Sequence, residues 1–195
     1  SRYYFEQGVG SNIVGYTQLI GPEALEAYRR RGYQGSEAVG QTGIERWAEN
    51  YLSGKHGGIL HVTNPSTGAI VTKVGESQRE PANSIYLTID RNLQYYAEQS
   101  IKGFTGAVVV LERDTGRVLA MASSPDFDSN AFQPNPNQAA QLAELQNGSL
   151  INRAAQGQYP LGSVFKIITM AAGMESGLYT AETTYDCQYD WTKLP

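Results

Sequence analysis

The amino-acid sequence predicts an α+β fold, because paired strand-like segments alternate with segments of helical character. Two pairs of apolar, β-branched runs flank turns rich in polar residues and glycine: residues 58–64 with 68–74, and residues 106–112 with 117–123. Residues 164–174 are almost all apolar and contain no proline, which predicts a central helix buried on all sides. The 195 residues suffice for one large domain or two small ones.

The composition excludes several classes of protein. Hydrophobic residues make up 41% of the chain, and the net charge is −4 without a basic block, so we expect no nucleic-acid partner. No apolar run has the length of a membrane span. Cys187 is the only cysteine, which excludes an intrachain disulfide. His56 and His61 are the only histidines, so we expect no metal site, and no motif indicates a cofactor.

The first part of the chain predicts a small module of short elements. Residues 1–20 are interpreted as extended, and Pro22 begins a short helix. That helix ends in Arg29–Arg31, whose charges suit the negative end of a helix better than an anion site. Thr42–Glu45 matches a capping box, and Gly54 ends the helix that follows. The apolar face of this second helix comprises Ile44, Trp47, Ala48, Tyr51 and Leu52.

A polar and irregular stretch, residues 75–83, is interpreted as a domain boundary. It separates an N-terminal module, residues 1–80, from a second domain, residues 81–195. Residues 85–89 predict a strand by their β-branched and aromatic content, and Asp90 predicts the cap of the next helix. The apolar face of that helix comprises Leu93, Tyr96, Ala97 and Ile101.

The hairpin of residues 106–123 is nearly continuously apolar in both strands, whereas a sheet with one wet face alternates. We therefore expect helices on both faces of this antiparallel sheet, one of them the apolar helix behind Ser163. Residues 124–136 form a long loop with three prolines. Residues 137–147 predict a short helix that ends at Gly148.

A serine and a lysine stand three residues apart at the start of the apolar helix. Pro160 and Gly162 break the chain before Ser163, and helical spacing places Lys166 on the same face. A serine hydroxyl becomes a nucleophile when a base removes its proton, and a neutral lysine can be that base. The N–H groups of the helix start can stabilise an oxyanion. The structural alternative is a capping serine with a solvated lysine, because S-x-x-K alone occurs by chance in many proteins.

Three separated segments resemble the class B penicillin-binding proteins, the peptidoglycan transpeptidases of bacterial elongation and division. They are IYLTIDRNLQ (85–94), GAVVVLERDTGRVLAMASSPDFDSNAF (106–132) and INRAAQGQYPLGSVFK (151–166). The earlier segments RYYF…IVGY, TGIERWAENYLSGKHG and REP resemble the non-catalytic N-terminal module of that family. The resemblance covers essentially the whole chain.

This resemblance implies a pedestal module followed by part of a penicillin-binding/serine β-lactamase-like domain, outside the bacterial cytoplasmic membrane. Ser163 would attack the penultimate D-alanine of a stem peptide that ends in D-alanyl-D-alanine, with its own backbone N–H in the oxyanion hole. Lys166 would accept the serine proton as the general base. β-Lactam antibiotics, which mimic this peptide end, would acylate the same serine. Other cell-wall synthesis proteins would bind the N-terminal module, and no metal or cofactor is implied.

Two further motifs of the family, S-x-N and K-T-G, are absent from the sequence. Ser129 and Asn130 are adjacent rather than spaced, and Gln41-Thr42-Gly43 lacks the lysine. Leu161 and Val164 stand where the family commonly has proline and threonine. We therefore expect the chain to be a portion of a longer protein, inactive alone, whose other part completes the sheet.

Two other functions are compatible with the sequence. A class D β-lactamase, or the related β-lactam sensor domain, uses the same serine–lysine pair but needs no N-terminal module of about eighty residues. A non-catalytic penicillin-binding-like scaffold would serve partner binding alone, and the intact S-x-x-K motif argues against it. The sequence does not distinguish a role in elongation from a role in division.

Overall fold

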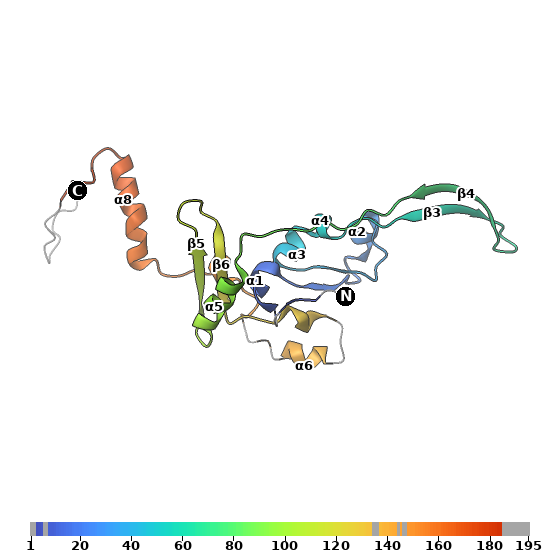
Figure 1. Cartoon of the computed structure of the whole chain (residues 1–195), viewed down its shortest axis with the longest axis horizontal. Helices are drawn as coiled ribbons and strands as arrows, with labels where there is room; N and C mark the ends of the chain where they lie inside the picture. Colours follow the sequence, from blue (N-terminus) through green and yellow to red (C-terminus); the bar gives the residue numbers. More distant parts are fainter. Residues whose placement is uncertain (1–2, 6–7, 134–136, 144, 146–147, 185–195) are drawn as a thin grey trace. The chain divides into compact units, whose positions relative to one another are not determined.

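The chain divides into two compact units, Ser1–Gly157 and Gln158–Pro195 (Figure 1). Helices and small antiparallel sheets both occur, which confirms the α+β class. Cys187 lies outside the described residues, and the domain boundary near residue 80 stays a prediction. The computed structural model describes residues 3–5, 8–133, 137–143, 145 and 148–184.

The described elements are short. The first unit contains α1 (Ser11–Val14), β1 (Thr17–Leu19), α2 (Leu25–Arg30), β2 (Ala38–Gly40), α3 (Gly43–Trp47), α4 (Glu49–Leu52), β3 (Gly58–Thr63), β4 (Ile70–Ser77), α5 (Arg91–Ile101), β5 (Gly106–Leu111), β6 (Val118–Ser124), the 3-10 helix η2 (Ser129–Phe132), α6 (Gln138–Ala143) and α7 (Arg153–Gln156). The second unit contains the 3-10 helix η3 (Gly162–Phe165) and α8 (Lys166–Glu175).

The N-terminal module is built around the antiparallel pair of β1 and β2, in which Thr17 lies opposite Gly40. Thr17 and Val39 are fully buried, and the Tyr4 hydroxyl donates to Thr17 Oγ1 at 3.4 Å. Helix α3 packs against β2, so close that a side chain at Gly40 would meet the backbone of Glu45. A buried glycine contact therefore sets the distance between this helix and the strand.

The predicted capping box does not form, although Thr42 is the N-cap residue of α3. The Thr42 side chain makes no capping hydrogen bond, and Glu45 turns into the core, where Tyr4 Oη lies 3.5 Å from its Oε1. A tertiary contact with the N-terminal segment thus replaces the local pairing. The helix also breaks at Ala48 into α3 and α4, and Trp47 and Tyr51 point outward, with 74% and 59% of their surface exposed.

The hairpin predicted over residues 58–64 and 68–74 is confirmed, but β4 continues to Ser77, so the first three residues of the stretch 75–83 are not irregular as predicted. Strands β3 and β4 pair antiparallel as a two-stranded ribbon that Figure 1 shows in teal and green. Asn64 Oδ1 accepts the backbone N–H of Ser66 at 2.9 Å, and Gly68 has a φ of +69°, as its place in the turn requires. His61 lies opposite Lys73 in the ribbon, which agrees with its interpretation as a strand residue.

The second predicted hairpin is confirmed as β5 and β6, and α5 covers one face of this sheet. Asp90 caps α5 as predicted, by accepting the N–H of Leu93 at 2.8 Å. Ala97 packs on Ala120 and Ala122, and the cluster is extended by Leu93, Ile101, Val108 and Val110. In contrast, Val109 and Leu111 are 45% and 58% exposed, so the second face is not fully covered by the described residues.

Residues 85–89 do not form the predicted strand. This segment and Asp90 after it make two contacts with β6: Thr88 Oγ1 donates to the carbonyl of Val118 at 2.6 Å, and the Asp90 N–H donates to that of Leu119 at 2.9 Å. Strand propensity reflects side-chain packing on a pleated surface, and Tyr86 is 94% exposed here.

The loop after β6 fastens the N-terminal segment to the rest of the first unit. Ser129 Oγ donates to the buried carbonyl of Gly15 at 2.8 Å, and Asn130 bonds both backbone groups of Tyr4. Phe132 stacks on Tyr16, with ring centroids 3.6 Å apart. The long loop therefore has a structural role in this chain, because its side chains replace backbone pairing between distant segments.

Two predicted helices are shorter than expected. Helix α2 begins at Leu25, after a turn that contains Pro22, and α6 ends at Ala143. The arginines at the end of α2 have structural contacts: Arg30 pairs with Glu26 at 3.4 Å, and Arg31 donates to Asn50. The pair of Arg30 and Glu26 agrees with the structural interpretation of the arginine run.

Candidate active site

Ser163 lies in a 3-10 turn that leads directly into α8. The preceding Gly162 has a φ of +51°, a left-handed conformation that glycine adopts without strain, as the predicted break before the serine requires. The Lys166 N–H donates to the carbonyl of Ser163, which closes the 3-10 turn. Residues three apart eclipse one another in such a turn, so the backbone brings Ser163 and Lys166 to the same side.

Helix α8 begins at Lys166 and ends where the sequence predicts. The Ser176 N–H donates to the carbonyl of Ala172 at 3.0 Å, and Gly177 follows with a φ of +73°. Within its own unit the helix is not covered: Ile167 and Met170, for example, are 71% and 63% exposed. Its packing against β5 and β6 stays a prediction, since α8 belongs to the second unit.

Residues 151–156, near the end of the first unit, are held in that unit by side-chain hydrogen bonds. Asn152 caps α7 by accepting the N–H of Ala155 at 3.2 Å, and its amide donates to the carbonyl of Asn12 in α1 at 3.2 Å. Ser123 Oγ, on β6, donates to the carbonyl of Ile151 at 2.9 Å and accepts the N–H of Arg153 at 3.0 Å. These hydrogen bonds fix the position of the residues that end the first unit, shortly before the serine motif in sequence.

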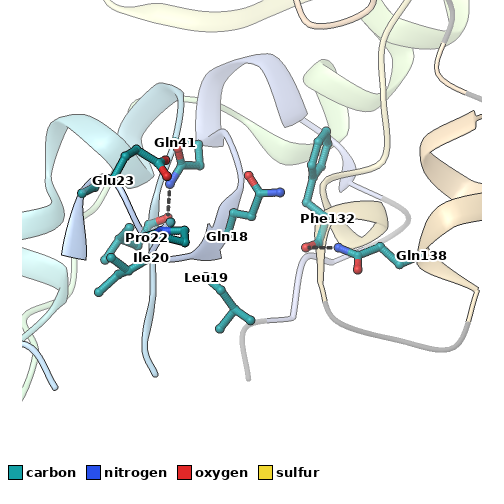
Figure 2. A pocket seen from close by; sticks show the side chains of 11 residues that line it. Gln18, Leu19, Ile20, Pro22, Glu23, Gln41, Phe132 and Gln138 are labelled. Carbon is teal, nitrogen blue, oxygen red and sulfur yellow. Dashed lines mark hydrogen bonds between the residues drawn. The ribbon is translucent and has the colours of Figure 1, made fainter. Parts of the chain in front are cut away.

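A pocket of about 550 Å³ lies between β1 and the loop that contains η2, away from the serine motif in sequence. Figure 2 shows Phe132 and Gln138 on one side of it and Gln18 and Leu19 on the other. The Gln138 side chain donates to the carbonyl of Phe132 at 3.1 Å. The pocket contains no candidate nucleophile beside a base, so it offers no acyl-transfer chemistry.

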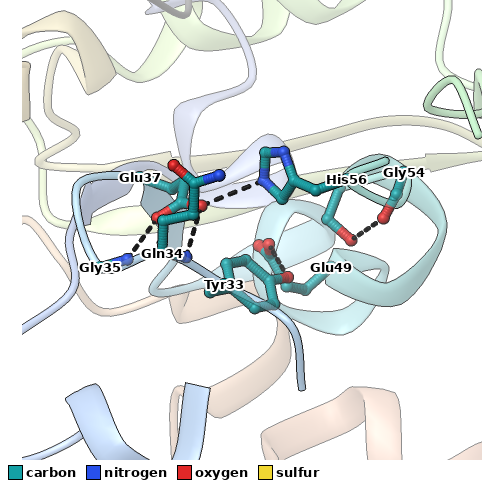
Figure 3. A network of polar contacts seen from close by, with 8 residues as sticks. Tyr33, Gln34, Gly35, Glu37, Glu49, Gly54 and His56 are labelled. Atoms are coloured by element: carbon teal, nitrogen blue, oxygen red, sulfur yellow. Dashed lines mark hydrogen bonds and ion pairs between the residues drawn. The ribbon is translucent and has the colours of Figure 1, made fainter. Parts of the chain in front are cut away.

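A polar network in the N-terminal module was not predicted from the sequence. His56 Nε2 lies 3.0 Å from Glu37 Oε1, and Glu37 also accepts the N–H groups of Gln34 and Gly35 at 2.8 and 2.7 Å (Figure 3). Burial raises the pKa of Glu37, but these N–H groups and the nearby His56 more than offset that effect, so its pKa lies below the ordinary value. The network connects the loop before β2 to the residues just before the start of β3.

The chain matches two family models. Residues 1–87 match the penicillin-binding protein dimerisation domain, and residues 106–193 match the penicillin-binding protein transpeptidase domain. The peptidoglycan D,D-transpeptidase MrdA of Escherichia coli K12 is 33% identical over all of this chain, and that of Acinetobacter baumannii is 31% identical over 91% of it. The chain spans about 31% and 27% of the length of these relatives.

Solved structures share the fold. The crystal structure of Pseudomonas aeruginosa PBP2 in complex with WCK 5153 superposes with a TM-score of 0.69 and 29% identity, over 95% of this chain and 38% of that one. The complex between PBP2 and MreC from Helicobacter pylori superposes with a TM-score of 0.75 and 26% identity, over 93% of this chain and 34% of that one. Sequence motifs, family models and fold agree, and the chain therefore belongs to the penicillin-binding proteins, with a match to their dimerisation domain and to part of their transpeptidase domain.

Proposed function

We propose that the parent protein is a peptidoglycan D,D-transpeptidase in which Ser163 is the nucleophile and Lys166 the general base. The observation that carries the proposal is the 3-10 turn at the start of α8, which places the two residues on one side of the backbone inside the segment that matches the transpeptidase model. The MrdA relatives are named as peptidoglycan D,D-transpeptidases.

In the proposed reaction, Lys166 accepts the proton of the Ser163 hydroxyl while Oγ attacks the carbonyl of the penultimate D-alanine. The N–H groups near the start of the helical segment, that of Ser163 included, stabilise the oxyanion. The bond to the terminal D-alanine breaks, and the leaving amine takes the proton from Lys166. The amine of a neighbouring stem peptide then attacks the acyl-enzyme, which forms the cross-link and frees the serine. A β-lactam forms the same ester but keeps its leaving group, so deacylation is slow.

The module that matches the dimerisation model is proposed to bind other cell-wall synthesis proteins. One structural neighbour is PBP2 in complex with MreC, and another comes from a peptidoglycan synthase complex. The parent protein would work outside the cytoplasmic membrane, where peptidoglycan is cross-linked. Among the described residues, no helix combines the length and the apolar character that a membrane crossing needs.

The test is the intact mass of the full-length protein under denaturing conditions, with and without benzylpenicillin. We expect a covalent adduct of one penicillin, mapped by peptide sequencing to Ser163. Rapid release of the adduct with turnover of the antibiotic would instead indicate a β-lactamase. A folded, full-length protein without any adduct would contradict the acyl-transfer proposal and favour the scaffold.

Replacing Lys166 by arginine should abolish acylation of the full-length protein by a β-lactam. The general base must accept the serine proton, and a guanidinium, which stays protonated, cannot do so. Stopped-flow measurement of β-lactam acylation gives the rates of the wild type and the variant. Acylation of Lys166→Arg at the wild-type rate would contradict Lys166 as the base.

A further inference from the structure

A second pocket of the N-terminal module, of about 490 Å³, combines an exposed tryptophan with planar polar groups. Trp47 ends α3, at the break before α4, and 74% of its surface is exposed. The pocket is lined by Tyr28, Arg31, Gly40, Gln41, Arg46, Trp47, Glu49 and Asn50. The indole of Trp47 therefore offers an exposed aromatic face to a ligand in this pocket.

The polar side of this pocket is held in place before any ligand binds. The Arg31 guanidinium lies over Tyr28 and Tyr33, at 5.1 and 5.6 Å from the ring centroids, and donates to Asn50 Oδ1. A guanidinium that is already ordered loses less entropy on binding than a free one. Arg31 and Asn50 therefore present fixed hydrogen-bonding groups beside the indole of Trp47.

The charge of the pocket is positive. Glu49 is buried, and its two oxygens already accept the Tyr33 hydroxyl at 2.8 Å and the Gly40 N–H at 2.7 Å. Arg46 is exposed and, within the part of the chain that the structure describes, forms no ion pair. Two guanidinium groups thus face one carboxylate whose oxygens are engaged, which favours a ligand that carries carboxylates.

We infer that this pocket binds an acidic glycan, in which a sugar ring stacks on Trp47 and carboxylates pair with Arg46 and Arg31. An indole face packs well on the C–H face of a sugar, and planar guanidinium and amide groups pair with hydroxyl and carboxylate oxygens. The core of a protein–protein interface is depleted in charged residues, whereas seven of the eight lining residues here carry hydrogen-bonding side chains and three of these are charged. The glycan would be a peptidoglycan strand with its stem peptides, a choice that rests on the proposed function.

The test uses the full-length protein in detergent and two soluble probes: un-cross-linked peptidoglycan strands with stem peptides, and the neutral sugar chitohexaose. Trp47→Ala should weaken the binding of both probes about tenfold, because a stacking contact is lost. Arg46→Gln should weaken only the acidic strands and reduce the salt dependence of their binding. Titration calorimetry gives each dissociation constant.

The matched control is Tyr51→Ala, since Tyr51 is an exposed aromatic residue of the neighbouring α4 that does not line the pocket. This variant should bind both probes like the wild type. Equal affinities for Trp47→Ala and Tyr51→Ala would overturn the inference, as would a Trp47→Ala variant that loses a co-purifying protein but binds glycan normally. Penicillin labelling of Ser163 in every variant tests the proposed function separately from glycan binding. A failure of the glycan inference therefore does not imply a failure of the proposed function, and the reverse also holds.

Discussion

Replacing Ser163 by alanine should abolish acylation of the full-length protein by penicillin. The variant lacks Oγ, the atom that forms the ester in the proposed reaction. The turn itself should persist, because the Lys166 N–H can still donate to the backbone carbonyl of residue 163. Loss of a catalytic nucleophile removes at least about a thousandfold of rate, because binding and the oxyanion site alone retain little activity. Gel fluorescence after incubation with a labelled penicillin measures the loss.

The matched control is Ser176→Ala, at the other end of α8. Ser176 is an exposed serine of the same unit, whose Oγ donates to the carbonyl of Gly173 at 2.6 Å. This variant should be labelled like the wild type, because its hydroxyl serves only the end of the helix. Labelling of Ser163→Ala at the wild-type rate would show that another residue is the nucleophile. Normal cell-wall growth with Ser163→Ala as the sole copy would identify a scaffold.

The local features of this chain could be predicted from the sequence. The β5–β6 hairpin, the Asp90 cap and the glycine after α8 each depend on residues that are close in sequence, and each is confirmed. Ser163 and Lys166 are likewise close in sequence, and the 3-10 turn puts them on the same side of the backbone. Their chemical roles remain predictions.

The features that failed depend on distant partners. The spacing of Glu45 to Thr42 predicts a capping box, but the Glu45 side chain lies in the core beside Tyr4 instead. The Glu37–His56 contact joins two loops that carry no common local pattern, so no signal in the sequence could have found it. Helical spacing groups Trp47 with the apolar residues of one helix, but the helix breaks at Ala48 and Trp47 is exposed. In each case a tertiary contact or a helix break overrides local propensity.

Substitution of Gly15 by alanine should unfold the N-terminal module. Gly15 follows α1 with a φ of +84° and a ψ of −159°, a region that is essentially restricted to glycine. A Cβ at this position would lie 2.0 Å from the backbone oxygen of Thr42, at the start of α3. Backbone on both sides leaves no flexible side chain to move aside, so we expect the free energy of unfolding to fall by more than about 3 kcal/mol. Urea unfolding followed by circular dichroism measures this change.

Gly58→Ala provides the matched control for this prediction. Gly58 lies in β3 outside the left-handed region, and nothing lies within 4 Å of the position that its Cβ would take. Its midpoint in urea should stay close to that of the wild type, within about 0.5 kcal/mol of stability. Gly15→Ala should also release the hydrogen bond that Ser129 Oγ makes to the Gly15 carbonyl, since that carbonyl must move with the clash. Equal midpoints for the two variants would contradict the close approach of α1 and α3, and with it the anchoring of the N-terminal segment by the loop after β6.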